Sequence, residues 1–430
     1  MNYRSVFETI VLKIQELLQS SDFLDAHRIE NHFIRKRLLS MYHVVLFLIY
    51  STKQKMDTNI GNFRFDLFNL DFPKKISKQA LSKARQGIHP ALFLSFFELS
   101  VDVFYNHISR KKYWRGKFSL FAIDGSKLSL PPSPSNFEVF GHRFYKKNPK
   151  REWSEGLASI AYDVCNDYIV HGLLWNGLSS ERAMAKEHFS VIEKRNLLKN
   201  AIFIFDRGYY SEEMFRLFYE KDCFCLMRLK ESLKIVKTCK GRSLSTVLPG
   251  NPKKGTKDIP IRVISVDLGN GTTEYLATNI PEEEIPLDCY KELYFKRWPI
   301  ELKYNEIKNQ HLLEEFTGKT SISVLQEFFL NLLMSNLASL VKAEADETIA
   351  NSANSDNKYE YQANRAYIIG RLKKVFPHVM AGMRPIDTLF DIFDEVITVK
   401  SQIQPGRSCP RTKKSRKNER KHFANRKRAV

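Results

Sequence analysis

Residues 118–125 read FSLFAIDG, an apolar run that ends at Asp124 and Gly125. An apolar run that stops at a turn-forming pair is typical of a strand buried on both faces. Residues 201–208 repeat the pattern as AIFIFDRG, and Asp206 follows the run directly. The sequence therefore predicts two buried core strands, each with an aspartate at its end.

The spacing of apolar residues changes along the segments around these strands, and this spacing distinguishes strands from helices. The predicted order along the chain is three strands, a helix, a strand, a helix and a strand. This is the order of a ribonuclease H-like fold, and we therefore predict an α/β class with such a core. Beside the strand that ends at Asp124, the predicted elements are strands at about 156–164 and 168–175 joined by a turn at Asn166-Asp167, a helix at 180–194, a strand at 201–205, a helix at 211–219 capped by Ser211, and a strand at 223–230.

The predicted core is interrupted. Residues 231–286 carry turn signals and strand-like runs at 261–266 and 273–277, which indicate a mainly β insertion. The core is then split into residues 113–230 and 287–345, and the second part reads as helical from Tyr290 to about Val341.

Both ends of the chain are expected to add to this core. The C-terminal part predicts a helical region at 346–400, with a loop over 345–357 and a helix over 364–376, and then a basic disordered tail at 401–430. Residues 1–112 predict an N-terminal helical, DNA-binding region. Within it, Ser77 is a suitable cap for a helix at 78–86, Gly87 ends that helix, and Pro90 opens the next. This pair is either a helix-turn-helix-like DNA reader or an ordinary packing unit.

Charge indicates the class of partner. Lys and Arg exceed Asp and Glu by 20, and the pI is about 9.5. A surplus of this size favours a polyanionic partner, which is nucleic acid or an anionic membrane surface. The last 30 residues hold eleven Lys or Arg and one Glu, and are expected either to contact phosphates or to act as a solubilising tail.

Other classes are disfavoured. The N-terminus has no cleavable signal pattern, and the apolar runs 41–50 and 328–341 are too short or too interrupted by polar residues to span a bilayer. We expect buried helices there and no membrane role. The six cysteines form no matched CxxC pairs, so no zinc site is expected, and a cytosolic protein fits this pattern.

The most informative stretch for chemistry is YFKRWPIELKYNEIK, residues 294–308. It places Tyr294, Arg297, Glu301 and Lys308 at the spacing Y-x2-R-x3-E-x6-K. On one continuous helix these four lie within an arc of about 60°. Pro299 either kinks that helix or stands in its first turn, with Tyr294 and Arg297 in the approach.

Three carboxylates from separate elements suit phosphoryl transfer on DNA, because they can hold two Mg²⁺ ions about 3.5–4 Å apart. Asp124, Asp206 and Glu301 are the candidates. The competing interpretation of each aspartate is a turn former at a strand end. Glu306 is the nearest rival for the third carboxylate, but it lies about 140° from Glu301 on a helical wheel.

The tetrad resembles the signature of bacterial insertion-sequence transposases of the DDE type, specifically the insertion sequence four family. The contexts AIDGS at 122–126, FDRGY at 205–209 and YLATNI at 275–280 are similar to the family as well. The resemblance covers about residues 70–376. It implies metal-dependent cleavage at terminal inverted repeats and strand transfer into target DNA, which is cut-and-paste transposition.

The resemblance also implies roles for single residues. Asp124, Asp206 and Glu301 look like the catalytic, metal-binding triad, with Mg²⁺ as cofactor (two ions, replaceable by Mn²⁺). Tyr294, Arg297 and Lys308 look like residues that hold DNA phosphates. Trp298 either stacks on a base or packs in the core. The implied partners are double-stranded DNA, as inverted repeats and target, and a second copy in a synaptic homodimer, at the nucleoid in the bacterial cytoplasm.

One departure bears on the DNA hairpin intermediate that some members form. Part of the family carries a base-stacking tryptophan in the β insertion, and none of Trp114, Trp153, Trp175 and Trp298 lies in 231–286. Tyr275 is a possible substitute. The alternatives left open are a ribonuclease H-like nuclease or resolvase without strand transfer, a catalytically silent DNA-binding relic or repressor, and a membrane-surface protein that uses the basic tail.

Overall fold

The computed structural model describes residues 1–34, 39–51, 53–67, 76–145, 148–239, 241–269, 271–353 and 358–404. The chain divides into two compact units. The first comprises Met1–Arg110, Leu128–Gly156 and Glu306–Val430, and the second comprises Lys111–Lys127 and Leu157–Asn305.

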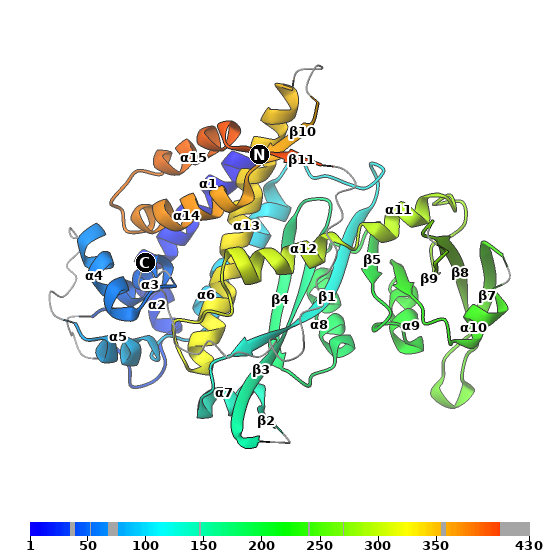
Figure 1. Cartoon of the computed structure of the whole chain (residues 1–430), viewed down its shortest axis with the longest axis horizontal. Coiled ribbons are helices and arrows are strands. Elements are labelled where there is room, and N and C mark those ends of the chain that lie inside the picture. Colours follow the sequence, from blue (N-terminus) through cyan, green and yellow to red (C-terminus); the bar gives the residue numbers. More distant parts are fainter. Residues whose placement is uncertain are drawn as a thin grey trace. The chain divides into compact units, whose positions relative to one another are not determined.

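The first unit is mainly helical (Figure 1). Its centre is α13, which packs against α1, α6, α14 and α15. The described elements of this unit are α1 (Tyr3–Gln19), α2 (Ser21–Ala26), α3 (Met41–Tyr50), α4 (Met56–Asp66), α5 (Lys78–Arg85), α6 (Ala91–His107), α7 (Pro134–Phe140), β2 (His142–Tyr145), a π-helical turn (Glu306–Gln310), α13 (Ser321–Asn351), β10 (Glu360–Ala363), α14 (Arg365–Met380), α15 (Asp387–Thr398) and β11 (Lys400–Ile403).

Helix α13 is the one described helix that is long and apolar enough to cross a membrane, and 83% of its apolar window is buried inside the protein. Two of its polar residues have partners inside the protein, since the Ser335 hydroxyl donates to Glu306 at 2.7 Å and the Asn331 amide donates to the Glu327 carbonyl at 2.6 Å. The predicted buried helix at 328–341 is confirmed. The loop expected over 345–357 was wrong up to Asn351, because buried Ala345 and Ile349 continue the apolar stripe by one helical turn each.

The predicted helix pair at 77–93 is confirmed as α5 and α6. The Ser77 hydroxyl accepts from the Ala80 amide at 3.1 Å, as expected of an N-cap. Gly87 allows a close approach, since a Cβ there would lie 2.5 Å from the Cβ of His32. One face of α6 is deeply buried, and α6 packs against α13. The pair therefore serves as a packing unit, and its DNA-reading role stays a prediction.

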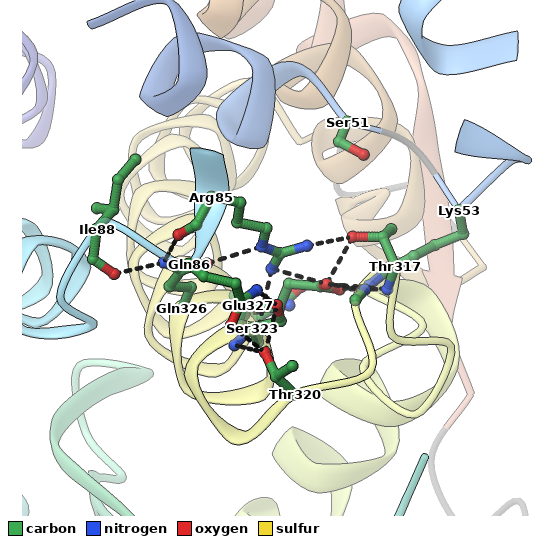
Figure 2. A network of polar contacts seen from close by, with 12 residues as sticks. Ser51, Lys53, Arg85, Gln86, Ile88, Thr317, Thr320, Ser323, Gln326 and Glu327 are labelled. Carbon is green, nitrogen blue, oxygen red and sulfur yellow. Dashed lines mark hydrogen bonds and ion pairs between the residues drawn. The ribbon is translucent and has the colours of Figure 1, made fainter. Parts of the chain in front are cut away.

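A buried polar network joins α5 to α13 (Figure 2). Arg85, which is 2% exposed, donates to Gln326 at 2.7 Å, to Glu327 at 3.0 Å and to the hydroxyl of Thr317 at 2.9 Å. Lys53 adds a second cation 2.8 Å from Glu327. Burial raises the pKa of Glu327, but the charges of Lys53 and Arg85 outweigh burial and lower this pKa well below its usual range.

The second unit is built on a mixed sheet. Its strands lie in the order β3-β1-β5-β6-β9-β8-β7, with β4 paired to β3. The elements of this unit are β1 (Ser119–Leu130), β3 (Asn148–Asp163), β4 (Tyr168–Asn176), α8 (Glu181–Lys194), β5 (Ala201–Phe205), α9 (Glu212–Glu220), β6 (Phe224–Arg228), α10 (Lys234–Thr238), β7 (Ser243–Leu248), a 3₁₀ turn (Pro252–Lys254), β8 (Ile259–Asp267), β9 (Thr273–Thr278), α11 (Cys289–Phe295) and α12 (Pro299–Asn305); the ends of β1 and β3 extend into the first unit.

The predicted α/β class and the order of three strands, helix, strand, helix and strand are confirmed by β1, β3, β4, α8, β5, α9 and β6. Strand β1 is parallel to β5, and β5 is parallel to β6. Residues 120–123 of β1 and all five residues of β5 are apolar and buried, which explains why the sequence reads as a continuous apolar run in both places.

Strands β7, β8 and β9 come from residues 231–286, and β8 and β9 agree with the runs expected at 261–266 and 273–277. They form an antiparallel set, and β9 pairs with β6, so these strands extend the sheet (Figure 1). At the other end of the sequence, the chain pairs β11 with β10 up to Ile403. The first residues assigned to a disordered tail are therefore a strand, and residues 405–430 lie outside the described residues.

Candidate active site

Asp124 and Asp206 occupy equivalent positions on neighbouring parallel strands. Ala122 pairs with Ile204, and each aspartate lies two residues beyond its member of that pair. The expectation that Asp124 ends its strand was wrong, because β1 continues to Leu130, whereas Asp206 directly follows β5. The parallel register nevertheless places both carboxylates at the same point of the sheet, as the two apolar runs predicted.

The surroundings of the Asp124 carboxyl group disfavour its charged form. Burial, with the charges of Glu181 and Asp206 acting in the same direction, raises its pKa to about 6. The Gly125 amide, which donates to Asp124 Oδ1 at 2.9 Å, and the Arg297 guanidinium oppose this shift. The charged form of Asp124 thus lacks the cationic surroundings that would fully compensate it.

The backbone of Asp124 is held by two hydroxyl groups. Ser159 donates to the Asp124 carbonyl at 3.1 Å, and Tyr304 donates to the same oxygen at 2.8 Å. Tyr304 lies on α12, three residues after Glu301. The hydroxyl of Tyr304 therefore connects the helix that carries Glu301 to the strand that carries Asp124.

Ser159 is oriented by two buried histidines. His188 Nε2 lies 2.9 Å from Ser159 Oγ, and His188 Nδ1 lies 2.9 Å from His171 Nδ1. Because the Ser159 proton is donated to Asp124, Nε2 of His188 must donate to Ser159, and His171 must donate to His188. Burial lowers the pKa of both histidines, to about 4 for His171, which favours the neutral rings that this chain of hydrogen bonds requires.

Glu301 is presented by a short helix that begins at Pro299. Helix α11 ends at Phe295 and α12 runs from Pro299 to Asn305, so the alternative in which Pro299 stands in the first turn is the observed one. Arg297 lies in the turn between the helices. Its guanidinium donates to Glu301 Oε1 at 2.7 Å and lies 3.8 Å from Asp124 Oδ2. Arg297 thus lies between two of the three predicted carboxylates.

Tyr294 and Trp298 differ in exposure. Tyr294 is 8% exposed, its hydroxyl lies 3.4 Å from Asp206 Oδ1, and burial raises its pKa. Arg228 lies 3.6 Å from the same oxygen of Asp206. Trp298 is 46% exposed, so its ring does not lie in the core.

Glu306 and Lys308 belong to the first unit. Glu306 accepts from Ser335 at 2.7 Å and from Arg365 at 2.9 Å, which gives this rival carboxylate a structural role. Burial lowers the pKa of Lys308. The single helical wheel drawn from Tyr294 to Lys308 does not hold, because the chain breaks at 296–298 and a π-helical turn replaces α12 after Asn305.

The donor set fits a hard divalent cation, because carboxylate oxygens are the ligands that Mg²⁺ and Mn²⁺ prefer. In the described part of the chain, no three His, Cys, Asp or Glu side chains already stand in a metal-binding arrangement. Arg297 occupies the contacts between Glu301 and Asp124 instead.

Sequence reasoning missed several residues of this site: Glu181, Ser159, His188, Tyr209 and Tyr304. Glu181 follows the N-cap Ser180, where an acid is expected for helix stability alone. Ser159, His188 and Tyr304 act through contacts that only the folded chain creates. The glycines of AIDGS and FDRGY were the available signal, since glycine permits the close approach of another group.

Comparison with known proteins gives two positive findings. A family model described as "Transposase DDE domain" matches residues 115–337. Among solved structures, the cryo-EM structure of piggyBac transposase in a synaptic complex with hairpin DNA is similar with a TM-score of 0.46 and 10% identity, covering 96% of this chain and 88% of that chain. No curated protein matches this chain.

Proposed function

The chain belongs to the transposase DDE domain family, and from this premise we propose that it is a DNA transposase that cuts at terminal inverted repeats and joins the freed ends to target DNA. The observation that carries the proposal is the juxtaposition of Asp124 and Asp206 on parallel strands with Arg297, which connects Asp124 to Glu301. These three carboxylates are the proposed catalytic groups.

Asp124, Asp206 and Glu301 would hold the divalent cations, Mg²⁺ or Mn²⁺ and two in number. When bound, such ions activate the attacking oxygen and stabilise the leaving oxygen of a phosphodiester. The protein's own contribution is to fix the carboxylates. Ser159 and Tyr304 hold the Asp124 backbone, and the α11–α12 turn presents Glu301.

Arg297 has two alternative sets of partners. It now neutralises Glu301 and faces Asp124. With the carboxylates holding cations, its planar guanidinium would be able to contact a DNA phosphate with two donors. Tyr294, beside Asp206, and the exposed Trp298 are proposed to position the cleaved end, and Lys308 is proposed as a further phosphate contact.

Finer features are part of the same proposal. We assign the chain to the insertion sequence four family, with a ribonuclease H-like core at 113–230 and 287–345, the insertion 231–286, and flanking regions 1–112, 346–400 and 401–430. The strand order β4-β3-β1-β5-β6 supports that core. The proposed partners are double-stranded DNA and a second copy in the synapse, and the proposed location is the bacterial cytoplasm, at the nucleoid. A DNA hairpin intermediate is an open step of the mechanism.

The test is an end-cleavage and strand-transfer assay with DNA that carries the element's inverted repeat and with Mg²⁺ or Mn²⁺. We expect joined products from the wild type and background activity from Asp124→Asn, Asp206→Asn and Glu301→Gln. The matched control is Asp222→Asn, an exposed aspartate in a left-handed turn where asparagine fits, and it should keep full activity. Hydrolysis without joined product would favour a nuclease, and cleavage by Asp124→Asn would refute the triad.

A further inference from the structure

A fourth carboxylate lies between the two aspartates of the candidate site. Glu181 is the first residue of α8, and its side chain reaches the backbone next to both aspartates. A Cβ on Gly125 would lie 2.8 Å from Glu181 Oε1, and a Cβ on Gly208 would lie 3.6 Å from Oε2. Gly125 follows Asp124 and Gly208 lies two residues after Asp206. The two glycines therefore make room for this carboxylate.

A buried hydroxyl group faces the same place without a partner. Tyr209 is 1% exposed, and its hydroxyl oxygen has no hydrogen-bond partner within the described chain. The charges of Asp124, Glu181 and Asp206 all act on this phenol and, together with burial, raise its pKa. A buried hydroxyl without a partner costs free energy, on the order of 1–3 kcal/mol. Its position beside three carboxylates indicates a site built for a ligand.

Helix stability alone does not account for Glu181. An acid in the first turn of a helix is ordinarily favoured by the helix dipole. Here the Glu181 carboxylate instead reaches the residues beside Asp124 and Asp206, where its negative charge adds to theirs. Like charges gathered at one place repel one another, and a bound cation would offset that repulsion.

We propose that Glu181 is a fourth carboxylate of the cation site and that it binds a divalent cation together with Asp124 and Asp206, with the Tyr209 hydroxyl donating to a ligand of that cation. The inference rests on the proposed function, because it concerns the same site. It adds a residue from α8 to the three carboxylates of the β1, β5 and α12 segments.

The experiment is calorimetric titration of the full-length protein with Mn²⁺ alone, without DNA. We expect Glu181→Gln to weaken Mn²⁺ binding by about 10–100-fold. Glu187→Gln, an exposed acid on the same helix, is the matched control and should bind as the wild type does. Glu181→Asp keeps a carboxylate and should recover part of the affinity. The thermal midpoint of metal-free Glu181→Gln should equal or exceed that of the wild type, since a crowded charge is removed.

Each contrary result has a distinct meaning. Mn²⁺ binding by Glu181→Gln at wild-type strength, with binding lost in Asp206→Asn, overturns the role of Glu181 and leaves the proposed function standing. Absence of Mn²⁺ binding in the wild type, or binding unaffected by Asp206→Asn, overturns the proposed metal site and the inference together. Equal weakening in Glu181→Gln and Glu181→Asp with a lowered metal-free thermal midpoint shows a structural role and also overturns the inference.

Discussion

At the scale of single residues, the backbone of Asp124 is fixed more firmly than its carboxylate. Two hydroxyl groups, from Ser159 and Tyr304, donate to its carbonyl, whereas the carboxylate accepts from the Gly125 amide and faces Arg297. A rigid backbone with an adaptable carboxylate suits the cation-binding role proposed for Asp124. Ser159 and Tyr304 are therefore positioning residues, which hold a proposed catalytic group in place through hydrogen bonds.

Tyr304→Phe tests this positioning. The substitution removes one donor to the Asp124 carbonyl and leaves the ring packing intact. We expect a loss of about 0.5–1.5 kcal/mol in the free energy of unfolding. Cleavage of end DNA should fall more than DNA affinity does, since the hydroxyl acts on Asp124 and not on DNA. Urea unfolding, a cleavage assay and a binding assay on the same variant measure the three quantities. Tyr219→Phe, an exposed phenol on α9, is the control.

The buried histidines give a pH prediction. Burial, together with the charge of Arg195, lowers the pKa of His171 from its ordinary value of 6.5 to about 4. The imidazole of His171 is therefore protonated below about pH 6.5 in the unfolded chain, but only below about pH 4 in the folded chain. Stability should fall with decreasing pH in this window by up to about 1.4 kcal/mol per pH unit. His171→Gln should unfold in urea with a smaller pH dependence than the wild type over pH 4–7, and an equal dependence would contradict the prediction.

At the scale of elements, local patterns predicted most strands and helices, and long-range contacts decided the rest. The run AIFIF became β5 because five consecutive buried residues require a strand covered on both faces. The end of β1 was not predictable, because the strand continues past Asp124 through residues of mixed polarity. Pro299 allowed two readings of residues 294–308, and only the structure shows the break between α11 and α12.

The contact between α5 and α13 can be tested at this scale. Arg85 and Glu327 are buried in a network that also holds Lys53, Thr317 and Gln326 (Figure 2). Removing Arg85 leaves Glu327 with Lys53 as its remaining cation and leaves buried Gln326 without its donor, so Arg85→Met should cost about 1–3 kcal/mol of unfolding free energy.

The double variant Arg85→Met/Glu327→Gln completes the comparison for this network. It should lose less free energy of unfolding than the two single variants added together, because it removes both charges of the pair. Strict additivity in urea unfolding would mean that the two side chains do not interact. Lys83→Ala, an exposed neighbour on α5, should leave stability nearly unchanged.

At the scale of the whole molecule, the charge of the candidate site is opposite in sign to the net charge of the chain. The candidate site gathers carboxylates, while the chain carries a net charge of +20. A basic protein attracts DNA over distances set by ionic strength, and in the proposed function the local acidic site binds divalent cations. Sequence reasoning captured the overall charge directly from composition. It missed Glu181 because the relevant signal is a distance from Gly125 and not a pattern along the chain.

The last prediction concerns the share of DNA binding that the C-terminal segment supplies. Residues 405–430 hold eleven Lys or Arg and one Glu, which is a net charge of +10. Each phosphate that the segment neutralises adds about 0.9 to the slope of log affinity against log salt. A chain ending at Gln404 should therefore bind duplex DNA more weakly at low salt and show a slope reduced by several units, while metal-dependent cleavage at saturating DNA persists because Asp124, Asp206 and Glu301 remain. A full-length variant with the eleven cations replaced by Gln separates charge from length. A slope equal to that of the intact protein in both variants would show that phosphate contacts come from the rest of the chain, and that the segment serves solubility alone.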